Sequence, residues 1–472
     1  MPRERLSPLD ASFLYLDGAV TCNQGLCYQV AEGAIDFERL VREMERKTRF
    51  VERLRQCAVF SPLNLFHPTW EFDPDFDIRN HVKRIVIDPP GDDARYWDTV
   101  SRIFRTHLDR KHPLWAIHVI DGCNDGRSAY LVSIHHCVTD GIGFARIASA
   151  LFDAERDLEV DPWTPPKEGP WPAPGMRLLY GLIDSLGSLP RVVSLLARGT
   201  AALAGGLLTR NGRTALRLLR RYRRAPGVRF AFNAPLSGEA SFSHVMLRLE
   251  DIARIRAATG STINDVVLAI VATALHRYAE SHGTATDGKF LRLLVPSNVR
   301  SVDTKDAMGN FVSMAPVLAP LGAMPVRERL AAITEYTRAM KDCGLARMLS
   351  LGIGLSQWAL SPPVSYLAHR VFSSLWLQRR SHVPHKAPPF NLVLTNVPGS
   401  TNPSYAAGHE LKDVNILVPL LASIGLVCCV LSHDGMMGIS FSGDRATVPD
   451  VGVLPEYVQG AFNELMAGLP EV

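Results

Sequence analysis

Residues 128–141 read SAYLVSIHHCVTDG, and they place two adjacent histidines between a predicted strand and a predicted helix. Ser128–Ile134 is an apolar run that favours a strand. After Gly141, apolar residues recur at helical spacing, which predicts a helix over Ile142–Asp157. The histidines therefore stand where a strand gives way to a loop, and this position orients the rest of the chain around them.

The two imidazoles are expected to have different tasks. Adjacent strand residues point to opposite faces, so His135 and His136 cannot both face one substrate, and they are badly placed to chelate one metal ion. We expect one ring to face a cavity and the other to support it. A neutral imidazole suits removal of a proton from a hydroxyl group. A packed histidine pair that ends a strand is the alternative, but Asp140 and Gly141 at this spacing favour catalysis.

Asp140 and Gly141 follow in the loop. Asp140 can accept hydrogen bonds from its own backbone or pair with a distant arginine. Gly141 is expected to supply backbone freedom just before the helix.

The same alternation of strands and helices continues through both halves of the chain and predicts an α/β protein. Further helices are predicted over 38–56, 96–108, 251–258 and 263–281. Further strands are predicted over 115–120, 241–249, 290–296, 390–395, 426–432 and 437–442.

With 472 residues, the chain is long enough for at least two domains. We predict an N-terminal domain over 1–175, a linker over 176–235 and a C-terminal domain over 236–472. The linker is rich in leucine and alanine and then carries seven arginines between Arg210 and Arg224. That composition fits an interfacial helix with a basic flank, or a buried helix beside a solvated basic face. Residues 345–380 are similarly apolar.

Composition excludes several classes of protein. A formal net charge of +4 does not suggest a nucleic-acid binder. There is no Walker loop, no complete nucleophile elbow, no full dinucleotide fingerprint and no zinc-binding His-Glu-x-x-His helix. The scattered cysteines, the lack of an apolar leader and the lack of a spanning run predict a cytoplasmic location.

Six short motifs, taken in order, resemble one family. These are Leu6-Ser7-Pro8-Leu9-Asp10, Pro113-Leu114-Trp115, the histidine motif, Asn264-Asp265, Pro296-Ser297-Asn298-Val299-Arg300 and Asn396-Val397-Pro398-Gly399. Together they are similar to the bacterial wax ester synthase/diacylglycerol acyltransferases, within the chloramphenicol acetyltransferase-like superfamily. One departure is Cys22-Asn23, where the family often carries a Met-His pair.

The resemblance implies two domains, each a mixed sheet flanked by helices, with a tunnel at their interface and His136 midway along it. It implies acyl-CoA as a co-substrate, no permanently bound cofactor, and diacylglycerol or a long-chain alcohol as acceptor. A polyketide or glycolipid alcohol, or a non-catalytic lipid-binding role, are the alternatives. The enzyme would act at the inner face of the membrane or at a lipid droplet, alone or as a homodimer.

Several residues take site roles by the same resemblance. Asn264 is expected to support the reaction site, and Asp265, Arg300, Pro113 and Trp115 to contribute to substrate binding. A helix N-cap is the alternative for Asn264 and Asp265, and core packing for Pro113 and Trp115. Asp140 is expected to be a structural partner of Arg300. The arginine cluster would contact either a membrane or the phosphates of coenzyme A.

Overall fold

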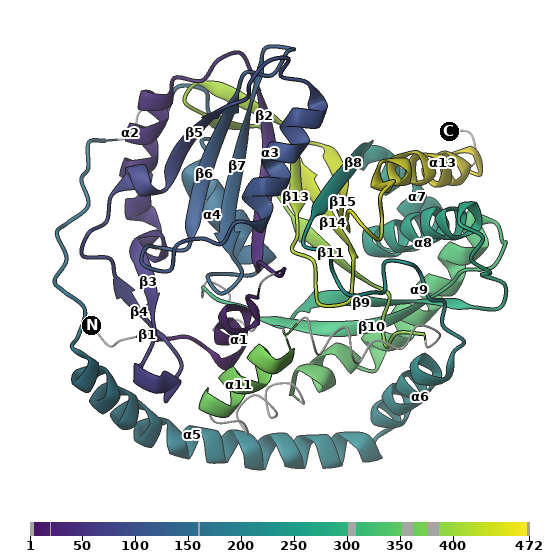
Figure 1. The fold of residues 1–472 in the computed structure, drawn as a ribbon. Coiled ribbons are helices and arrows are strands. Elements are labelled where there is room, and N and C mark those ends of the chain that lie inside the picture. Colours follow the sequence, from purple (N-terminus) through teal and green to yellow (C-terminus); the bar gives the residue numbers. More distant parts are fainter. Residues whose placement is uncertain are drawn as a thin grey trace.

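A computed structural model describes residues 4–18, 20–158, 161–300, 308–351, 362–372, 374 and 387–469. Two halves lie side by side, each built on a six-stranded mixed sheet, and a long helix runs beneath both (Figure 1). This arrangement confirms the predicted fold class.

The N-terminal sheet has the order β12-β13-β2-β7-β6-β5. Its helices divide between two faces. Helix α3 packs on one face, while α2 and α4 pack on the other. The elements are β2 (Gln24–Glu32), α2 (Phe37–Lys47), β5 (Val82–Val86), α3 (Asp93–Arg105), β6 (Trp115–Asp121), β7 (Arg127–His135), α4 (Gly141–Leu151), β12 (Ser404–Ala406) and β13 (His409–Leu417). A small sheet of β1 (Glu4–Arg5), β4 (Thr69–Phe72) and β3 (Gln56–Val59) lies beside them, near α1 (Pro8–Leu16).

The C-terminal sheet has the order β10-β9-β11-β14-β15-β8. Alternate residues of its central strands face opposite ways, because side chains alternate along a strand. Leu392 and Leu394 join the core beneath the helices, whereas Val393 and Val397 face the other half. The elements are β8 (Ala240–Arg248), α7 (Leu249–Thr259), α8 (Ile263–Ser281), β9 (Phe290–Asn298), β10 (Val312–Pro320), α9 (Val326–Asp342), β11 (Leu392–Pro398), β14 (Leu426–His433), β15 (Met436–Asp444) and α13 (Leu454–Ala467).

Strands β12 and β13 cross from the second half into the first. Strand β13 pairs antiparallel with β2, with Ile416 opposite Cys27 and Leu417 opposite Leu26. The division at 1–175, 176–235 and 236–472 stays a prediction about separate units. A part of the last range nevertheless completes the sheet of the first.

The predicted linker forms two helices, α5 (Pro174–Leu208) and α6 (Arg210–Arg224). Helix α6 buries Leu218 and Tyr222 against the C-terminal half and exposes its arginines. Helix α11 (Pro362–Phe372) lies between α5 and α1 (Figure 1). Most of the apolar stretch predicted within 345–380 lies outside the described residues.

Element boundaries differ from the predictions where tertiary contacts intervene. Helix α8 spans its predicted range. The helix predicted over 142–157 stops at Leu151, because Asp153 bonds to Tyr405 of β12 through both backbone groups. The helix predicted over 38–56 ends at Lys47, and a separate 3-10 turn over Glu52–Arg55 leads into β3.

No single helix among the described residues has the length and apolar character needed to cross a membrane. The pair α7 and α8 reaches that length and composition together, but it is bent by 100°.

Candidate active site

The histidine motif occupies the turn between β7 and α4. Strand β7 ends at His135, whose backbone N–H donates to Leu114 O at 3.0 Å. The N–H of His136 donates to Asn23 O at 2.7 Å, so β2 holds the first residue of the turn. The two imidazoles thus diverge, as the alternation of strand side chains predicts.

His135 is a buried anchor. Its Nδ1 accepts from the N–H of Cys137 at 3.1 Å, which assigns the ring proton to Nε2. Nε2 lies 3.1 Å from Asp17 Oδ2 and donates to it. Both ring nitrogens are therefore engaged, and His135 cannot take a proton from a substrate without losing a partner.

Asp17, which sequence reasoning missed, gathers polar groups from several segments. Its carboxylate accepts from the N–H of Asn23 at 2.9 Å, from Asn23 Nδ2 at 3.0 Å and from Arg110 at 3.0 Å. Burial would raise its pKa, but the nearby His107 and the hydrogen bonds from His135 and Asn23 outweigh burial and lower it. Asp17 is therefore an ionised support for the loop that carries the histidines.

His136 has a free ring. It stacks on Phe13 with ring centroids 4.7 Å apart and an interplanar angle of 15°. Nδ1 is buried without a hydrogen-bond partner, and the side chain of Asn310 lies beside the ring. Burial, followed by the neighbouring His135, lowers its pKa, which keeps the imidazole neutral near pH 7. A neutral, unengaged imidazole is what a general base requires.

His136 lines a cavity of about 150 Å³ between the two halves. Its walls are mostly apolar and come from both sheets, as the predicted interdomain tunnel requires. The lining residues are Phe13, Asn23, Gly25, Ile134, His136, Thr139, Asp140, Gly141, Phe144, Pro296, Asn310, Val312, Met314, Val393, Thr395, Val397, Ile416, Val418, Pro419, Leu421 and Val427.

Asp140 joins the two halves behind this cavity. One oxygen caps α4 by accepting from the N–H of Gly143 at 3.1 Å. The other lies 2.5 Å from Arg300 and accepts from the N–H of Phe311 at 3.0 Å. The expected pairing of Asp140 with Arg300 is confirmed, and it leaves Asp140 no free oxygen to act as a second base.

Gly141 is needed for a different reason from the expected one. It is the first residue of α4, and its φ angle does not lie in the left-handed region. A Cβ at this position would stand 2.7 Å from Val397 Cγ2 of β11. Space for the close approach of α4 to the opposite sheet, rather than backbone freedom, requires glycine here.

Asn310 is a second residue that the sequence alone did not single out. Its backbone N–H and side-chain amide donate to Asp10 Oδ1 at 2.9 and 2.7 Å, and the amide also reaches His136 O at 2.6 Å. Asp10 belongs to the opening motif that carried the family resemblance. The motif therefore marked Asp10 as a family feature, but nothing in it identified the partner Asn310, 300 residues away.

None of the five predicted substrate-binding residues, which include Arg300, lines the His136 cavity. Asp265 forms a capping box with Thr262 at the start of α8 and accepts from Thr337 at 2.7 Å. Asn264 has a buried side-chain oxygen without a partner. Trp115 is 2% exposed and stacks on His81, and Pro113 borders the same region. Thr262 is the N-cap of α8 and Asp265 completes its capping box, whereas Asn264 makes no capping bond. Trp115 matches the packing alternative, and a role of all these residues in substrate binding stays a prediction.

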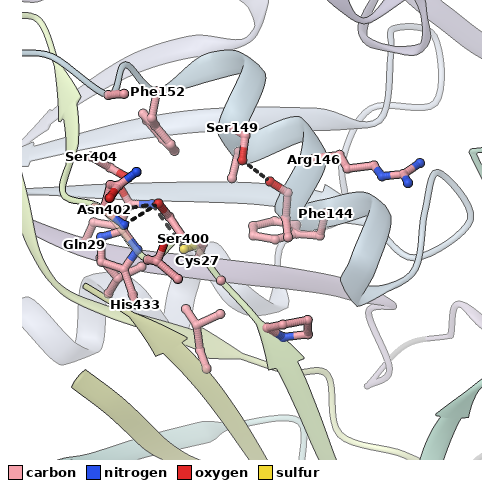
Figure 2. A pocket seen from close by; sticks show the side chains of 18 of the residues that line it. Cys27, Gln29, Phe144, Arg146, Ser149, Phe152, Ser400, Asn402, Ser404 and His433 are labelled. Atoms are coloured by element: carbon pink, nitrogen blue, oxygen red, sulfur yellow. Dashed lines mark hydrogen bonds between the residues drawn. The ribbon is translucent and has the colours of Figure 1, made fainter. Parts of the chain in front are cut away.

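A larger pocket of about 760 Å³ adjoins the cavity, and Phe144 lines both. Figure 2 shows it between α4, which carries Phe144 and Ser149, and the loop that carries Ser400 and Asn402. Ser400 Oγ donates to Asn402 O at 2.8 Å and accepts from its N–H at 3.0 Å, which fixes the loop. Among the described residues, no group of three histidine, cysteine or acidic side chains is arranged to hold a metal ion.

Comparison with known proteins gives a consistent result. A family model described as the wax ester synthase/diacylglycerol acyltransferase catalytic domain matches residues 6–267, and one described as the WS/DGAT C-terminal domain matches residues 308–466. Two proteins of Mycobacterium tuberculosis that are provisionally named diacylglycerol O-acyltransferases are 28% and 30% identical. Each alignment covers 98% of this chain, and 90% and 97% of the relatives.

Solved structures share the fold. The wax ester synthase/diacylglycerol acyltransferase from Marinobacter aquaeolei VT8 superposes with a TM-score of 0.64 at 21% identity, covering 98% of this chain and 99% of that one. The first condensation domain of the calcium-dependent antibiotic synthetase superposes with a TM-score of 0.59 at 16% identity, covering all of this chain and 97% of that one.

Proposed function

Because the chain belongs to the wax ester synthase/diacylglycerol acyltransferase family, and is thus an acyltransferase, we propose that it transfers a long-chain acyl group from acyl-CoA to diacylglycerol or a long-chain alcohol. His136 is the general base in this proposal. The observation that carries it is the contrast within the motif: His135 and Asp140 are fully engaged, whereas His136 has a free ring facing the cavity.

The chemistry needs one proton acceptor. His136 takes the proton of the acceptor hydroxyl, and the oxygen attacks the thioester carbonyl. Collapse of the tetrahedral intermediate forms the ester and breaks the C–S bond, and the departing thiolate takes the proton from the imidazolium. Positioned bases of this kind contribute about 10²- to 10⁴-fold.

The intermediate also needs a donor for its oxyanion. Asn264 was expected to support this point, but it does not line the cavity. The hydroxyls of Thr139 and Thr395 do line it, and neither bonds to a described residue. Thr139 and Thr395 are therefore the candidates for this role.

The two adjoining spaces differ in character, which suggests how the substrates divide between them. The His136 cavity has apolar walls suited to an alkyl chain. The 760 Å³ pocket carries hydroxyl and amide groups at Ser400, Asn402 and Ser404, suited to the polar arm of coenzyme A. In this proposal the thioester passes Phe144 to reach His136.

Lipid substrates require contact with a membrane or droplet, and α5 offers a surface for it. Apolar side chains at helical spacing are 40–63% exposed along one face of α5: Met176, Leu179, Leu182, Ile183, Leu186, Leu189 and Val193. On α11, Val364, Leu367 and Val371 are 49–64% exposed with the same spacing. The exposed arginines of α6 flank this surface, as peripheral binding to anionic lipid requires.

Thiol release from acyl-CoA, measured with a panel of alcohols, tests the proposal. Diacylglycerol and hexadecanol should support release, and His136→Gln should abolish it without unfolding the protein. Release with polyketide or glycolipid alcohols alone would redirect the substrate assignment. A folded protein that releases no thiol with any member of the panel would favour a non-catalytic lipid-binding role.

Co-sedimentation with anionic liposomes tests the membrane surface separately. Leu182→Gln/Leu186→Gln should reduce binding, and so should replacement of Arg217, Arg220, Arg221 and Arg224 with glutamine, because each basic residue contributes about 1 kcal/mol near such a surface. Turnover of a short, soluble alcohol should change little. Unaltered sedimentation of both variants would exclude this surface.

A further inference from the structure

A second cavity lies on the α3 face of the N-terminal sheet. Helix α3 ends at Arg105, while the sheet continues, so the last part of this face is left without a helix over it. A cavity of about 410 Å³ fills the space, and none of its lining residues lines the His136 cavity or the pocket of Figure 2. Gln24, His118 and Ser133 form its floor from three neighbouring strands.

The rim of this cavity is cationic. Lys83, which is directly opposite His118 in the sheet, and Arg102 of α3 are both exposed. Neither forms an ion pair with any residue that the structure describes. The carboxylate of Asp17, 3.7 Å away, and then Cys22 raise the pKa of His107 to about 10, so this third rim residue is a cation paired with Asp17. Asp109 is the one acidic residue among those that line the cavity. Two cations without an ion-pair partner among the described residues, and a third paired with Asp17, line one space and favour an anion.

Buried polar groups that line the cavity are hydrogen-bond acceptors that lack donors. His81 Nδ1 donates to Trp115 O at 2.9 Å, which leaves Nε2 as an acceptor, and Nε2 is buried without a partner. The amide nitrogen of Gln24 donates to the carbonyls of Ile103, Phe104 and Thr106, so its Oε1 is a second buried acceptor without a partner.

Ser133 completes the floor. Its hydroxyl is fully buried and also unpartnered. Buried acceptors without partners are costly, and a ligand that brings hydroxyl donors would satisfy them.

We propose that this cavity binds a small phosphorylated polyol, with its phosphate at Lys83, Arg102 and His107 and its hydroxyls on His81, Gln24 and Ser133. The cavity volume lies within the range of small-molecule sites. His107 also lies 3.7 Å from Asp17, the carboxylate that holds His135. Occupancy of the cavity is thereby linked to the support of the catalytic loop through one side chain.

Binding of glycerol 3-phosphate to the full chain, measured by isothermal titration calorimetry, tests this inference. Glycerol 3-phosphate should bind at least about tenfold more tightly than glycerol, which lacks the charge, or inorganic phosphate, which lacks the carbon-bound hydroxyls. Lys83→Gln/Arg102→Gln should weaken binding by on the order of 10- to 100-fold. Arg105→Gln is the matched control, because Arg105 lies on the same helix but lines a different cavity.

Ser133→Ala tests whether the Ser133 hydroxyl contacts a ligand or is a buried group without any partner. Removal of an unpartnered buried hydroxyl should leave Tm unchanged or raised. If the hydroxyl serves a ligand, the same change should weaken binding of glycerol 3-phosphate several-fold. Absence of saturable binding, or binding that is indifferent to Lys83→Gln/Arg102→Gln, overturns the proposal.

Competition identifies the source of the phosphate. Coenzyme A carries a phosphate on a ribose and has the same chemistry. Displacement of glycerol 3-phosphate by coenzyme A but not by dephospho-coenzyme A would assign the cavity to the co-substrate. Failure of both to displace it would assign the cavity to a separate metabolite. These binding readouts do not depend on turnover, so they stand apart from the proposed acyl transfer.

Discussion

Replacing Asp140 with asparagine should loosen the contact between the two halves. The Asp140 and Arg300 side chains are each 4% exposed and lie 2.5 Å apart, so the change takes the carboxylate of Asp140 away from a buried guanidinium. Breaking a buried ion pair from one side costs about 3–5 kcal/mol. Asparagine keeps an oxygen that can still cap α4, so the lower end, about 3 kcal/mol, is expected. Asp140→Ala also removes the cap, which adds about 1 kcal/mol.

Urea unfolding, followed by tryptophan fluorescence and circular dichroism, measures this loss, and turnover measured alongside should fall. Asp140→Asn/Arg300→Met should recover part of the stability, since a neutral pair leaves no buried charge. Lys47→Met is the matched control. It breaks the buried Lys47–Asp153 pair, 2.6 Å apart, within one half, and should destabilise while largely sparing turnover. A free energy of unfolding for Asp140→Asn within about 0.5 kcal/mol of wild type would refute the reasoning.

Three further outcomes are expected. His136→Ala should lower turnover by on the order of 10²-fold or more while Tm changes little. His135→Ala should lower both, because it removes the hydrogen bonds from its ring to Asp17 and from the N–H of Cys137 to its ring, which hold the loop. Equal Tm losses in the two variants would contradict this. The acid limb of the pH–rate profile should lie below pH 6.5, the ordinary pKa of histidine. Burial lowers the pKa of His136, so the base is protonated only when the pH falls below that lowered value. An acid limb above pH 6.5 would count against His136. Gly141→Ala should lower Tm and turnover together, because the added Cβ meets Val397, and Val397→Ala should partly restore both.

The sequence alone predicted several features of the site and of the fold. The period of two along a strand predicted that His135 and His136 would separate, and they do. The loop position of Asp140 predicted a structural partner, and Arg300 is that partner. The strongly apolar run of residues 263–281 predicted α8 with its observed bounds. In each case the pattern is local, or, for Asp140 and Arg300, both partners belong to recognisable motifs.

The sequence alone did not predict two long-range contacts that support the site. Asp17 meets His135 across 118 residues, and Asn310 meets Asp10 across 300. A single aspartate or asparagine in a loop carries no pattern that marks its partner, and turns and caps use the same residue types. Strand β13 was also missed, because His409–Leu417 mixes charged and apolar residues without clear alternation. Its partner β2 decides its place, and that information is tertiary.

Because β12 and β13 join the sheet of the first half, they affect how the protein folds during its synthesis. The ribosome releases β2 early, but the strand that covers its open edge is translated almost 400 residues later. Until then, β2 presents unpaired backbone groups to other nascent chains, as exposed sheet edges do. The first half therefore completes its fold only after most of the second has emerged, and a chaperone that shields the β2 edge during this interval would raise the yield of native protein.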